Sequence, residues 1–217
     1  MAHFTVIGLG RFGISACQEL VRLGHTVTGV DGDPKVADKY ADFVTQMVIC
    51  DCTDENALRE LDLINSETVV VAIGEDMQSS ILCTLCLKNI GVKNIWVKAS
   101  TKAHHTIISK LGVSRIIHPE EEMGLRVAQA LNYPMVNDYI SLGDGLYVVE
   151  IRINAHLANR PLAKLMADTN GSIEPLLIKR GDKIFKNIDL DFQVNANDTL
   201  LLCGKRAALK HIAPRLA

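Results

Sequence analysis

The stretch VIGLGRFG, residues 6–13, places three glycines at the end of an apolar run, and it decides which fold this chain of 217 residues adopts. In the dinucleotide-binding fingerprint, the first glycine permits a tight turn, the second lets the backbone approach a phosphate, and the third lets a helix pack on a strand. Gly8, Gly10 and Gly13 have this spacing, and a stretch with helical periodicity follows at residues 14–24. The segment therefore predicts a strand, a phosphate-binding turn and a helix.

The same alternation of apolar strand and helix continues beyond the glycines. Further strands are expected at residues 26–30, 44–49, 68–74, 94–98 and 115–118, with helices between them. Parallel strands need crossover connections, and helices that make those crossovers cover both faces of the sheet. The pattern predicts an α/β class with a Rossmann-like, doubly wound parallel sheet, followed by an amphipathic helix that begins at Pro119.

The alternation of strands and helices changes at residues 132–145, where Pro, Gly, Asn and Asp predict a linker or a turn-rich junction. Beyond it, strands are expected at residues 146–153, 172–185 and 198–204, with a helix near 160–169 and a terminal helix from Lys205. This arrangement predicts a small α+β module. We place the domain boundary so that residues 1–133 form a nucleotide-binding domain and residues 134–217 form the second domain.

Composition argues against several classes of function. A formal net charge of −2 and a charged fraction of 22% give no excess of basic residues for nucleic acid or an anionic membrane surface. No apolar run reaches the length of a membrane span, and the N-terminus lacks the features of a signal peptide. We therefore expect a cytoplasmic protein that does not bind nucleic acid.

The six cysteines include the close pairs Cys50/Cys52 and Cys83/Cys86. Structural disulfides are rare in a reducing cytosol, and no second CxxC has zinc spacing. Cys83 and Cys86 are expected to share a helix face as small buried hydrophobic residues. A redox sensor built on these two cysteines remains the alternative.

Asp31, at the end of the second strand, is placed to accept both hydroxyls of a ribose. Its charge disfavours a 2′-phosphate and hence NADP, whereas NAD, ADP and ATP all remain open. Arg11 in the glycine loop and Lys98 at a strand end are the cations expected to meet phosphate charge. Asp51 and Thr53 either contact the adenosine or cap the helix that follows.

Hydride transfer would need a general acid or base beside a nicotinamide, and no such polar cluster stands out. His104 and His105 would point in different directions on a helix, which argues against joint metal ligation. The residues therefore favour a binding protein over an enzyme. A small NAD-dependent oxidoreductase remains the alternative.

Six motifs in one order resemble the nucleotide-binding RCK (KTN) domain. They are VIGLGRFG, VDGD, DCTDENALREL, VVVAIGEDMQSSI, NIWVKA and RIIHPEEEMG. The whole chain is similar to the cytosolic regulatory subunits of bacterial Ktr potassium-uptake systems. The resemblance implies that the second module is an RCK_C (TrkA_C-like) domain and that the helix after Pro119 is a crossover helix joining partner subunits.

The resemblance further implies a homo-oligomer, an octameric ring built of dimers, docked at the inner face of the plasma membrane. Its partner would be a membrane potassium-translocating subunit of the KtrB type, gated by the ring. ATP and ADP would be the regulatory ligands, with Mg²⁺ or Ca²⁺ near the phosphates and no catalytic residue. An NAD(H)-responsive regulator is the second possibility that stays open.

By matched position, the resemblance also implies which residues form the nucleotide site. They are Gly8, Leu9, Gly10, Arg11, Phe12, Gly13, Asp31, Asp33, Asp51, Cys52, Thr53, Ala72, Ile73, Gly74, Glu75 and Lys98. Arg11 resembles a residue that reaches the γ-phosphate across a dimer interface. Glu120 resembles a carboxylate associated with the divalent cation, although a carboxylate at a helix start is also favoured by the helix dipole.

Overall fold

The structure is a computed structural model that describes residues 1–132, 136–167, 169, 172–205, 207–209 and 212. Contacts divide the chain into two compact units, Met1–Glu122 and Met123–Ala217. The boundary expected between residues 133 and 134 lies outside the described residues, as does part of the expected terminal helix. Within the described ranges, no helix is long and apolar enough to cross a membrane.

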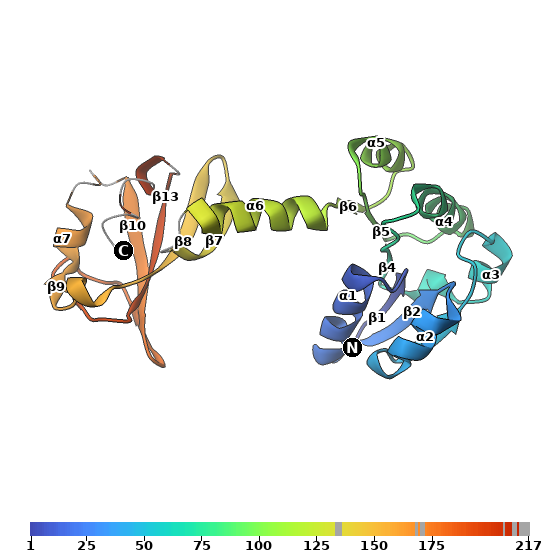
Figure 1. Cartoon of the computed structure of the whole chain (residues 1–217), viewed down its shortest axis with the longest axis horizontal. Coiled ribbons are helices and arrows are strands. Elements are labelled where there is room, and N and C mark those ends of the chain that lie inside the picture. Colours follow the sequence, from blue (N-terminus) through green and yellow to red (C-terminus); the bar gives the residue numbers. More distant parts are fainter. Residues whose placement is uncertain (133–135, 168, 170–171, 206, 210–211, 213–217) are drawn as a thin grey trace. The chain divides into compact units, whose positions relative to one another are not determined.

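The first unit contains a six-stranded, all-parallel sheet with flanking helices (Figure 1). Its strands are β1 (His3–Ile7), β2 (Thr26–Asp31), β3 (Gln46–Ile49), β4 (Thr68–Val71), β5 (Ile95–Lys98) and β6 (Arg115–Ile117). Its helices are α1 (Arg11–Arg22), α2 (Pro34–Tyr40), α3 (Glu55–Arg59), α4 (Met77–Ile90) and α5 (Lys102–Lys110), with short 3₁₀ turns η1 (Ala41–Phe43) and η2 (Leu63–Asn65). The predicted α/β class is confirmed.

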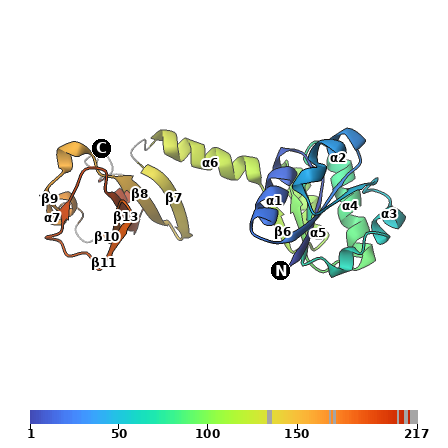
Figure 2. The ribbon, with the colours of Figure 1, turned by 90° about the horizontal axis from the view of Figure 1, so that it is seen from below.

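Alternation along the strands distributes side chains to two hydrophobic clusters on opposite faces of the sheet. Val6 and Val70 pack with α1 on one face, whereas Ile7 and Val71 pack with α4 on the other. Figure 2 shows helices flanking the sheet on both sides. Both faces are thus covered, as an all-parallel sheet requires.

The strand order is β3-β2-β1-β4-β5-β6. The direction of winding reverses between β1 and β4, which are neighbours at the centre of the sheet. In such sheets, ligands bind outside the carboxyl ends of the strands at this reversal. The sheet therefore places the glycine loop after β1 and the turn after β4 at the expected binding crevice.

Helix α6 (Pro119–Asn132) begins at the predicted proline and continues past the point where the contacts divide the chain. Its first turn carries three glutamates and belongs to the first unit. The assignment of the whole helix to the first domain stays a prediction.

The second unit contains a five-stranded sheet in the order β11-β10-β13-β8-β7. Its strands, all antiparallel to their neighbours, are β7 (Val136–Gly143), β8 (Leu146–Arg152), β10 (Ile173–Arg180), β11 (Lys183–Lys186) and β13 (Thr199–Lys205). A separate two-stranded sheet pairs β9 (Arg160–Pro161) with β12 (Gln193–Val194). The unit also contains the 3₁₀ turn η3 (Ala155–Leu157) and helix α7 (Leu162–Met166). The predicted α+β character of this module is confirmed.

The prediction of a linker or turn-rich junction at residues 132–145 is wrong for Val136–Gly143, which forms strand β7 paired with β8. The turn-forming residues that suggested a linker instead make the hairpin between the two strands. Gly143, Asp144 and Gly145 have φ values of 88°, 50° and 73°, in the left-handed region that glycine and aspartate tolerate.

Candidate nucleotide-binding site

The three glycines of the loop after β1 have different surroundings. Gly8 has a φ of +90°, and a Cβ on Gly13 would lie 2.0 Å from the carbonyl oxygen of Gly8. No side chain other than hydrogen fits at Gly13, because α1 and β1 meet there backbone to backbone. By contrast, a Cβ on Gly10 would have no atom within 4 Å. The loop is therefore closed against the strand at its ends and open at Gly10, the N-cap of α1.

Asp31 joins the end of β2 to this loop. Its Oδ2 accepts a hydrogen bond from the Leu9 backbone N–H at 2.7 Å, and its Oδ1 accepts one from the Asp33 N–H at 3.0 Å. Each carboxylate oxygen can accept more than one hydrogen bond, so ribose hydroxyls can still bind there. The same carboxylate thus orients the glycine loop and offers acceptors beside it.

Asp33, the second candidate for a ribose contact, is the N-cap of α2. Its side chain accepts a hydrogen bond from the Lys35 backbone N–H at 2.9 Å, and Pro34 occupies the first helical position. Both features stabilise a helix start. Asp33 therefore has a structural role that accounts for it without a ligand.

Asp51 and Thr53 lie in the loop after β3. Asp51 Oδ1 accepts hydrogen bonds from the Thr53 backbone N–H at 2.9 Å and the Thr53 hydroxyl at 2.7 Å. The hydroxyl contact is the main reason that the pKa of Asp51 is below its usual value. The N-cap of α3 is Asp54 and not Asp51. The exposed carboxylate of Asp51 therefore does not cap this helix.

The turn after β4 supplies another part of the crevice. Ala72 is buried, and its backbone N–H donates to the Ile7 carbonyl oxygen at 2.7 Å, which joins this turn to the end of β1. Ile73 packs beside Gly8, Gly74 is half-buried, and Glu75 is exposed. These residues therefore lie next to the glycine loop, as the sheet order requires.

Lys98, at the carboxyl end of β5, forms an ion pair with Glu120 in the first turn of α6. The Nζ to Oε1 distance is 2.6 Å, and the side chains are 12% and 70% exposed. A Cβ on Gly74 would lie only 2.8 Å from the Lys98 Nζ, so this glycine makes room for the ammonium group. The Nζ is also 5.9 Å from the centroid of the Phe12 ring. The structure thus places Lys98 between the glycine loop and the turn after β4.

The pKa of Glu120 is below its usual value, first because Lys98 donates a hydrogen bond to it, with a smaller contribution from the positive charge of Arg11. Arg11 is exposed at the start of α1. The two cations and one carboxylate predicted separately from the sequence are therefore neighbours. Among the described residues, no group of three or more His, Cys, Asp or Glu side chains could hold a metal ion.

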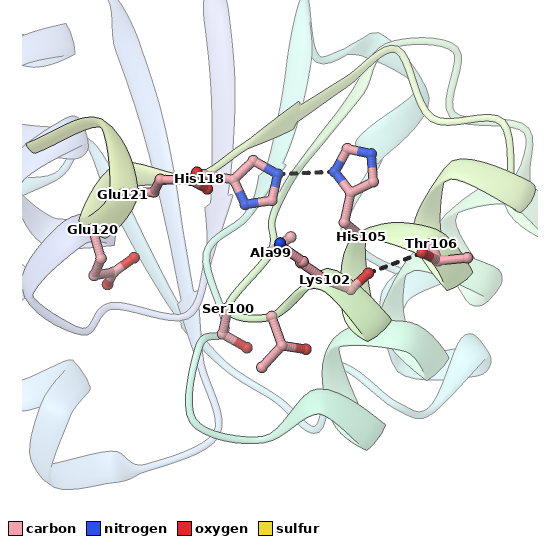
Figure 3. A pocket seen from close by; sticks show the side chains of 9 residues that line it. Ala99, Ser100, Lys102, His105, Thr106, His118, Glu120 and Glu121 are labelled. Atoms are coloured by element: carbon pink, nitrogen blue, oxygen red, sulfur yellow. Dashed lines mark hydrogen bonds between the residues drawn. The ribbon is translucent and has the colours of Figure 1, made fainter. Parts of the chain in front are cut away.

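A cavity of about 520 Å³ lies next to this ion pair (Figure 3). It is lined by Ala99, Ser100, Thr101, Lys102, His105, Thr106, His118, Glu120 and Glu121. His105 Nδ1 and His118 Nε2 are 2.8 Å apart. Sequence reasoning missed this contact, since only the return of β6 beside β5 brings the two rings together. His104 is buried and His105 exposed, so their predicted divergence is confirmed.

The amino-acid sequence of this chain is similar to one domain family and to several known proteins. The TrkA-N domain model matches residues 4–119. The chain is 39% identical to the Ktr system potassium uptake protein A of Bacillus subtilis (strain 168), over 96% of this chain and 94% of the relative. It is 38% identical to the Ktr system potassium uptake protein C of the same organism, over 99% and 97% of the two chains.

Solved structures show the same fold at low sequence identity. The RCK domain of GsuK has a TM-score of 0.67 and 11% identity, covering 100% of this chain and 48% of that one. The GsuK channel bound to NAD has a TM-score of 0.63 and 12% identity, covering 99% of this chain and 39% of that one. This chain thus spans half or less of the length of these GsuK structures.

Proposed function

The chain belongs to the family of the Ktr system potassium uptake proteins A and C, with a TrkA-N domain at residues 4–119, and we propose that it is a nucleotide-sensing regulatory subunit. It binds ATP and ADP and gates a membrane potassium-translocating subunit. It acts as a cytoplasmic ring of eight chains built of dimers, held at the inner face of the membrane by that partner. It is not an enzyme, and its role is to change the fraction of time for which the ion pathway of the partner subunit is open.

The observation that supports this proposal best is the group of charges beside the open glycine. Gly10 leaves space at the N-terminus of α1, where backbone N–H groups attract phosphate. Lys98, only 12% exposed, adds positive charge at that end of the sheet. Asp31 offers acceptors for a ribose whose 2′ and 3′ hydroxyls are free. Together these features suit a nucleotide with a 5′-polyphosphate.

A divalent cation fits this site only as part of a nucleotide complex. Glu120 is exposed and offers one carboxylate, and the described residues contain no complete metal site. Mg²⁺ is commonly held by one or two carboxylates together with substrate phosphates. We therefore propose that Glu120 holds Mg²⁺ or Ca²⁺ jointly with phosphate oxygens, where the ion would offset their negative charge.

Sensing requires that ATP and ADP favour different conformations of the ring. A ligand shifts such an equilibrium only by its difference in affinity for the two states, about 1.4 kcal/mol for each tenfold ratio. The γ-phosphate is the only group that distinguishes ATP from ADP. We propose that Arg11 of a neighbouring subunit contacts this phosphate, so that ATP bridges two subunits and ADP does not.

Calorimetric titration of the purified protein with ATP, ADP and NADH tests this proposal. Arg11→Ala should weaken ATP binding at least tenfold and leave ADP binding within twofold of the wild type. Arg22→Ala is the matched control, because Arg22 lies on the same helix but pairs with Glu19 in the last turn. An equal loss of ATP and ADP affinity would show that Arg11 is a general phosphate contact and would contradict the sensing role.

A regulator that responds to NAD(H) is the second candidate function. The observation that favours it is the fold shared with the GsuK channel bound to NAD, together with a ribose-binding carboxylate that NAD also accepts. The two candidates differ in the titration above. NADH binding that is tighter than ATP binding and insensitive to Arg11→Ala would favour this second function.

A further inference from the structure

Two histidines that the proposed nucleotide site does not use meet at the cavity beside it. His105 Nδ1 and His118 Nε2 are 2.8 Å apart, and the centroids of the two rings are 5.0 Å apart. Figure 3 shows that these two nitrogens face one another, one from α5 and the other from the residue between β6 and α6. Two imidazole nitrogens therefore converge on one small volume.

The fold fixes the backbone segments that carry these rings. Ile108, three residues after His105 on α5, is fully buried in the hydrophobic cluster of the first unit. The carbonyl oxygen of Ile117, the residue before His118, accepts a hydrogen bond from the Ala99 N–H at 2.9 Å. The rings are thus held within reach of one another, while the broad torsion about each Cβ–Cγ bond lets them adjust.

The direct hydrogen bond between the rings is easily replaced. One of the two nitrogens must carry the hydrogen and the other must accept it. His105 is exposed and His118 is half-buried, so water competes for both groups and the bond contributes little to stability. Because a cavity of about 520 Å³ lies beside both rings, another partner can reach the nitrogens.

A metal ion is the partner that best fits this pair. Imidazole is a preferred ligand of Zn²⁺, Cu²⁺ and Ni²⁺, and the Zn–N bond is about 2.0–2.1 Å long. At such a bond length, two nitrogens lie about 2.9 Å apart when the angle at the metal is a right angle, and about 3.3 Å apart in a tetrahedral site. The observed 2.8 Å is close to the first value. The pair therefore suits the right-angled geometry of Ni²⁺ or Cu²⁺, once both rings turn their lone pairs toward one ion.

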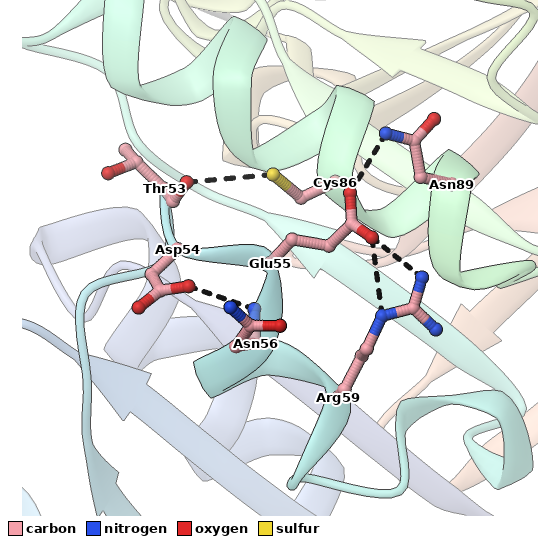
Figure 4. A network of polar contacts seen from close by, with 7 residues as sticks. All are labelled: Thr53, Asp54, Glu55, Asn56, Arg59, Cys86 and Asn89. Carbon is pink, nitrogen blue, oxygen red and sulfur yellow. Dashed lines mark hydrogen bonds and ion pairs between the residues drawn. The ribbon is translucent and has the colours of Figure 1, made fainter.

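Cysteine thiols are the other soft ligands in the first unit, and their structural surroundings differ. Cys83 is fully buried in the hydrophobic cluster, and the Cys86 thiol donates to the Thr53 carbonyl oxygen at 3.6 Å (Figure 4). Within the described part of the chain, no three His, Cys, Asp or Glu side chains are grouped around one ion. An ion on the histidine pair would therefore complete its coordination with water.

We propose that His105 and His118 chelate one divalent transition-metal ion per chain. Each ring stays neutral and carries its hydrogen on the nitrogen that faces away from the ion. The ion fastens α5 to the start of α6, because the residue after His118 is the first of that helix. This site needs no nucleotide and uses nitrogen ligands, so it is independent of the Mg²⁺ or Ca²⁺ proposed at Glu120.

Calorimetric titration of the full-length, nucleotide-free protein with Ni²⁺ tests the site. Ni²⁺ is the probe because thiolates favour Cu⁺ and Zn²⁺. The wild type should bind one Ni²⁺ per chain, and His105→Ala and His118→Ala should each weaken binding about tenfold or more. Since a chelate needs both rings, the double variant should bind within about threefold of either single variant. His156→Ala removes an exposed histidine of the second unit and is the matched control, expected to bind within about twofold of the wild type.

A second variant separates ligation from structure. His105→Gln keeps a side chain that can hydrogen-bond to His118 but lacks the imidazole ligand, so it should bind Ni²⁺ as weakly as His105→Ala. Circular dichroism without metal should show that all variants are folded, because neither ring is fully buried. Wild-type affinity in His105→Gln would overturn the proposal.

Three further outcomes would also overturn it. Losses that add up in the double variant would indicate two independent weak sites. Binding that survives both single substitutions but disappears when accessible thiols are alkylated would assign the ion to cysteine. Displacement of Ni²⁺ by a hundredfold excess of Mg²⁺ would indicate an oxygen site, since Mg²⁺ prefers oxygen ligands. A protein that binds Ni²⁺ as expected but binds no nucleotide would contradict the proposed function alone.

Discussion

Replacement of Gly13 by alanine should strongly destabilise the first unit, whereas the same replacement at Gly10 should not. A Cβ at Gly13 would lie 2.0 Å from the Gly8 carbonyl oxygen, and no side-chain rotation can separate the two atoms because the backbone fixes both positions. Relief requires α1 to shift by more than 1 Å from β1. That shift would disturb the buried contacts of Ile14 and Cys17.

Extra atoms forced into a well-packed site cost about 1–3 kcal/mol, and the rigid backbone contact favours the upper end of that range. A loss of about 3 kcal/mol should lower the melting temperature by roughly 10 °C for a unit of this size. At Gly10, φ is −64° and a Cβ meets no atom within 4 Å. Gly10→Ala should therefore cost under about 1 kcal/mol, as expected when alanine replaces glycine at an N-cap.

The single tryptophan provides the assay. Trp96 lies in β5, so the thermal change in its fluorescence reports unfolding of the first unit. Nucleotide titration completes the experiment, because a methyl group at Gly10 would occupy the space left for a phosphate and should reduce affinity at least tenfold. A Gly13→Ala variant that melts within 3 °C of the wild type, or a Gly10→Ala variant equally destabilised, would refute this account of the loop.

Two further predictions concern ion pairs. Arg180→Met should lower the free energy of unfolding in urea by about 2–3 kcal/mol, because it leaves the Asp198 carboxylate, which is 1% exposed, without its cation. This cost is below that of breaking a fully buried pair, since the Arg180 side chain is 34% exposed. A change under 0.5 kcal/mol would mean that the Asn195 N–H, the other donor to Asp198, suffices. The pKa of Glu120 is lowered in the folded protein, so its contribution is present above its ordinary pKa and is lost as pH falls through the lowered value. Glu120→Gln should therefore reduce the loss in free energy of unfolding between about pH 5 and pH 3, by no more than about 1 kcal/mol because the Glu120 side chain is so exposed. A variant that loses as much stability in acid as the wild type would contradict the pairing of Glu120 with Lys98.

Much of the fold was predictable because its signals are local. Strand and helix periodicity, the glycine spacing and the proline before α6 each depend on residues within a few positions of one another. The same signals misled at Val136–Gly143, where the turn chemistry of Gly143 and Gly145 was assigned to a linker although it closes a hairpin. A turn signal shows that the chain reverses, but it does not show whether the flanking residues pair.

The candidate site was predictable as a set of residues but not as a set of contacts. The sequence alone determined the α/β class and placed Gly10, Asp31 and Lys98 at strand ends, because alternation and turn chemistry act along the chain. The tertiary structure alone decided that Lys98 meets Glu120 and that His105 meets His118. These contacts join residues at least 13 positions apart, so they depend on strand order and side-chain packing, which no short-range pattern in the sequence encodes.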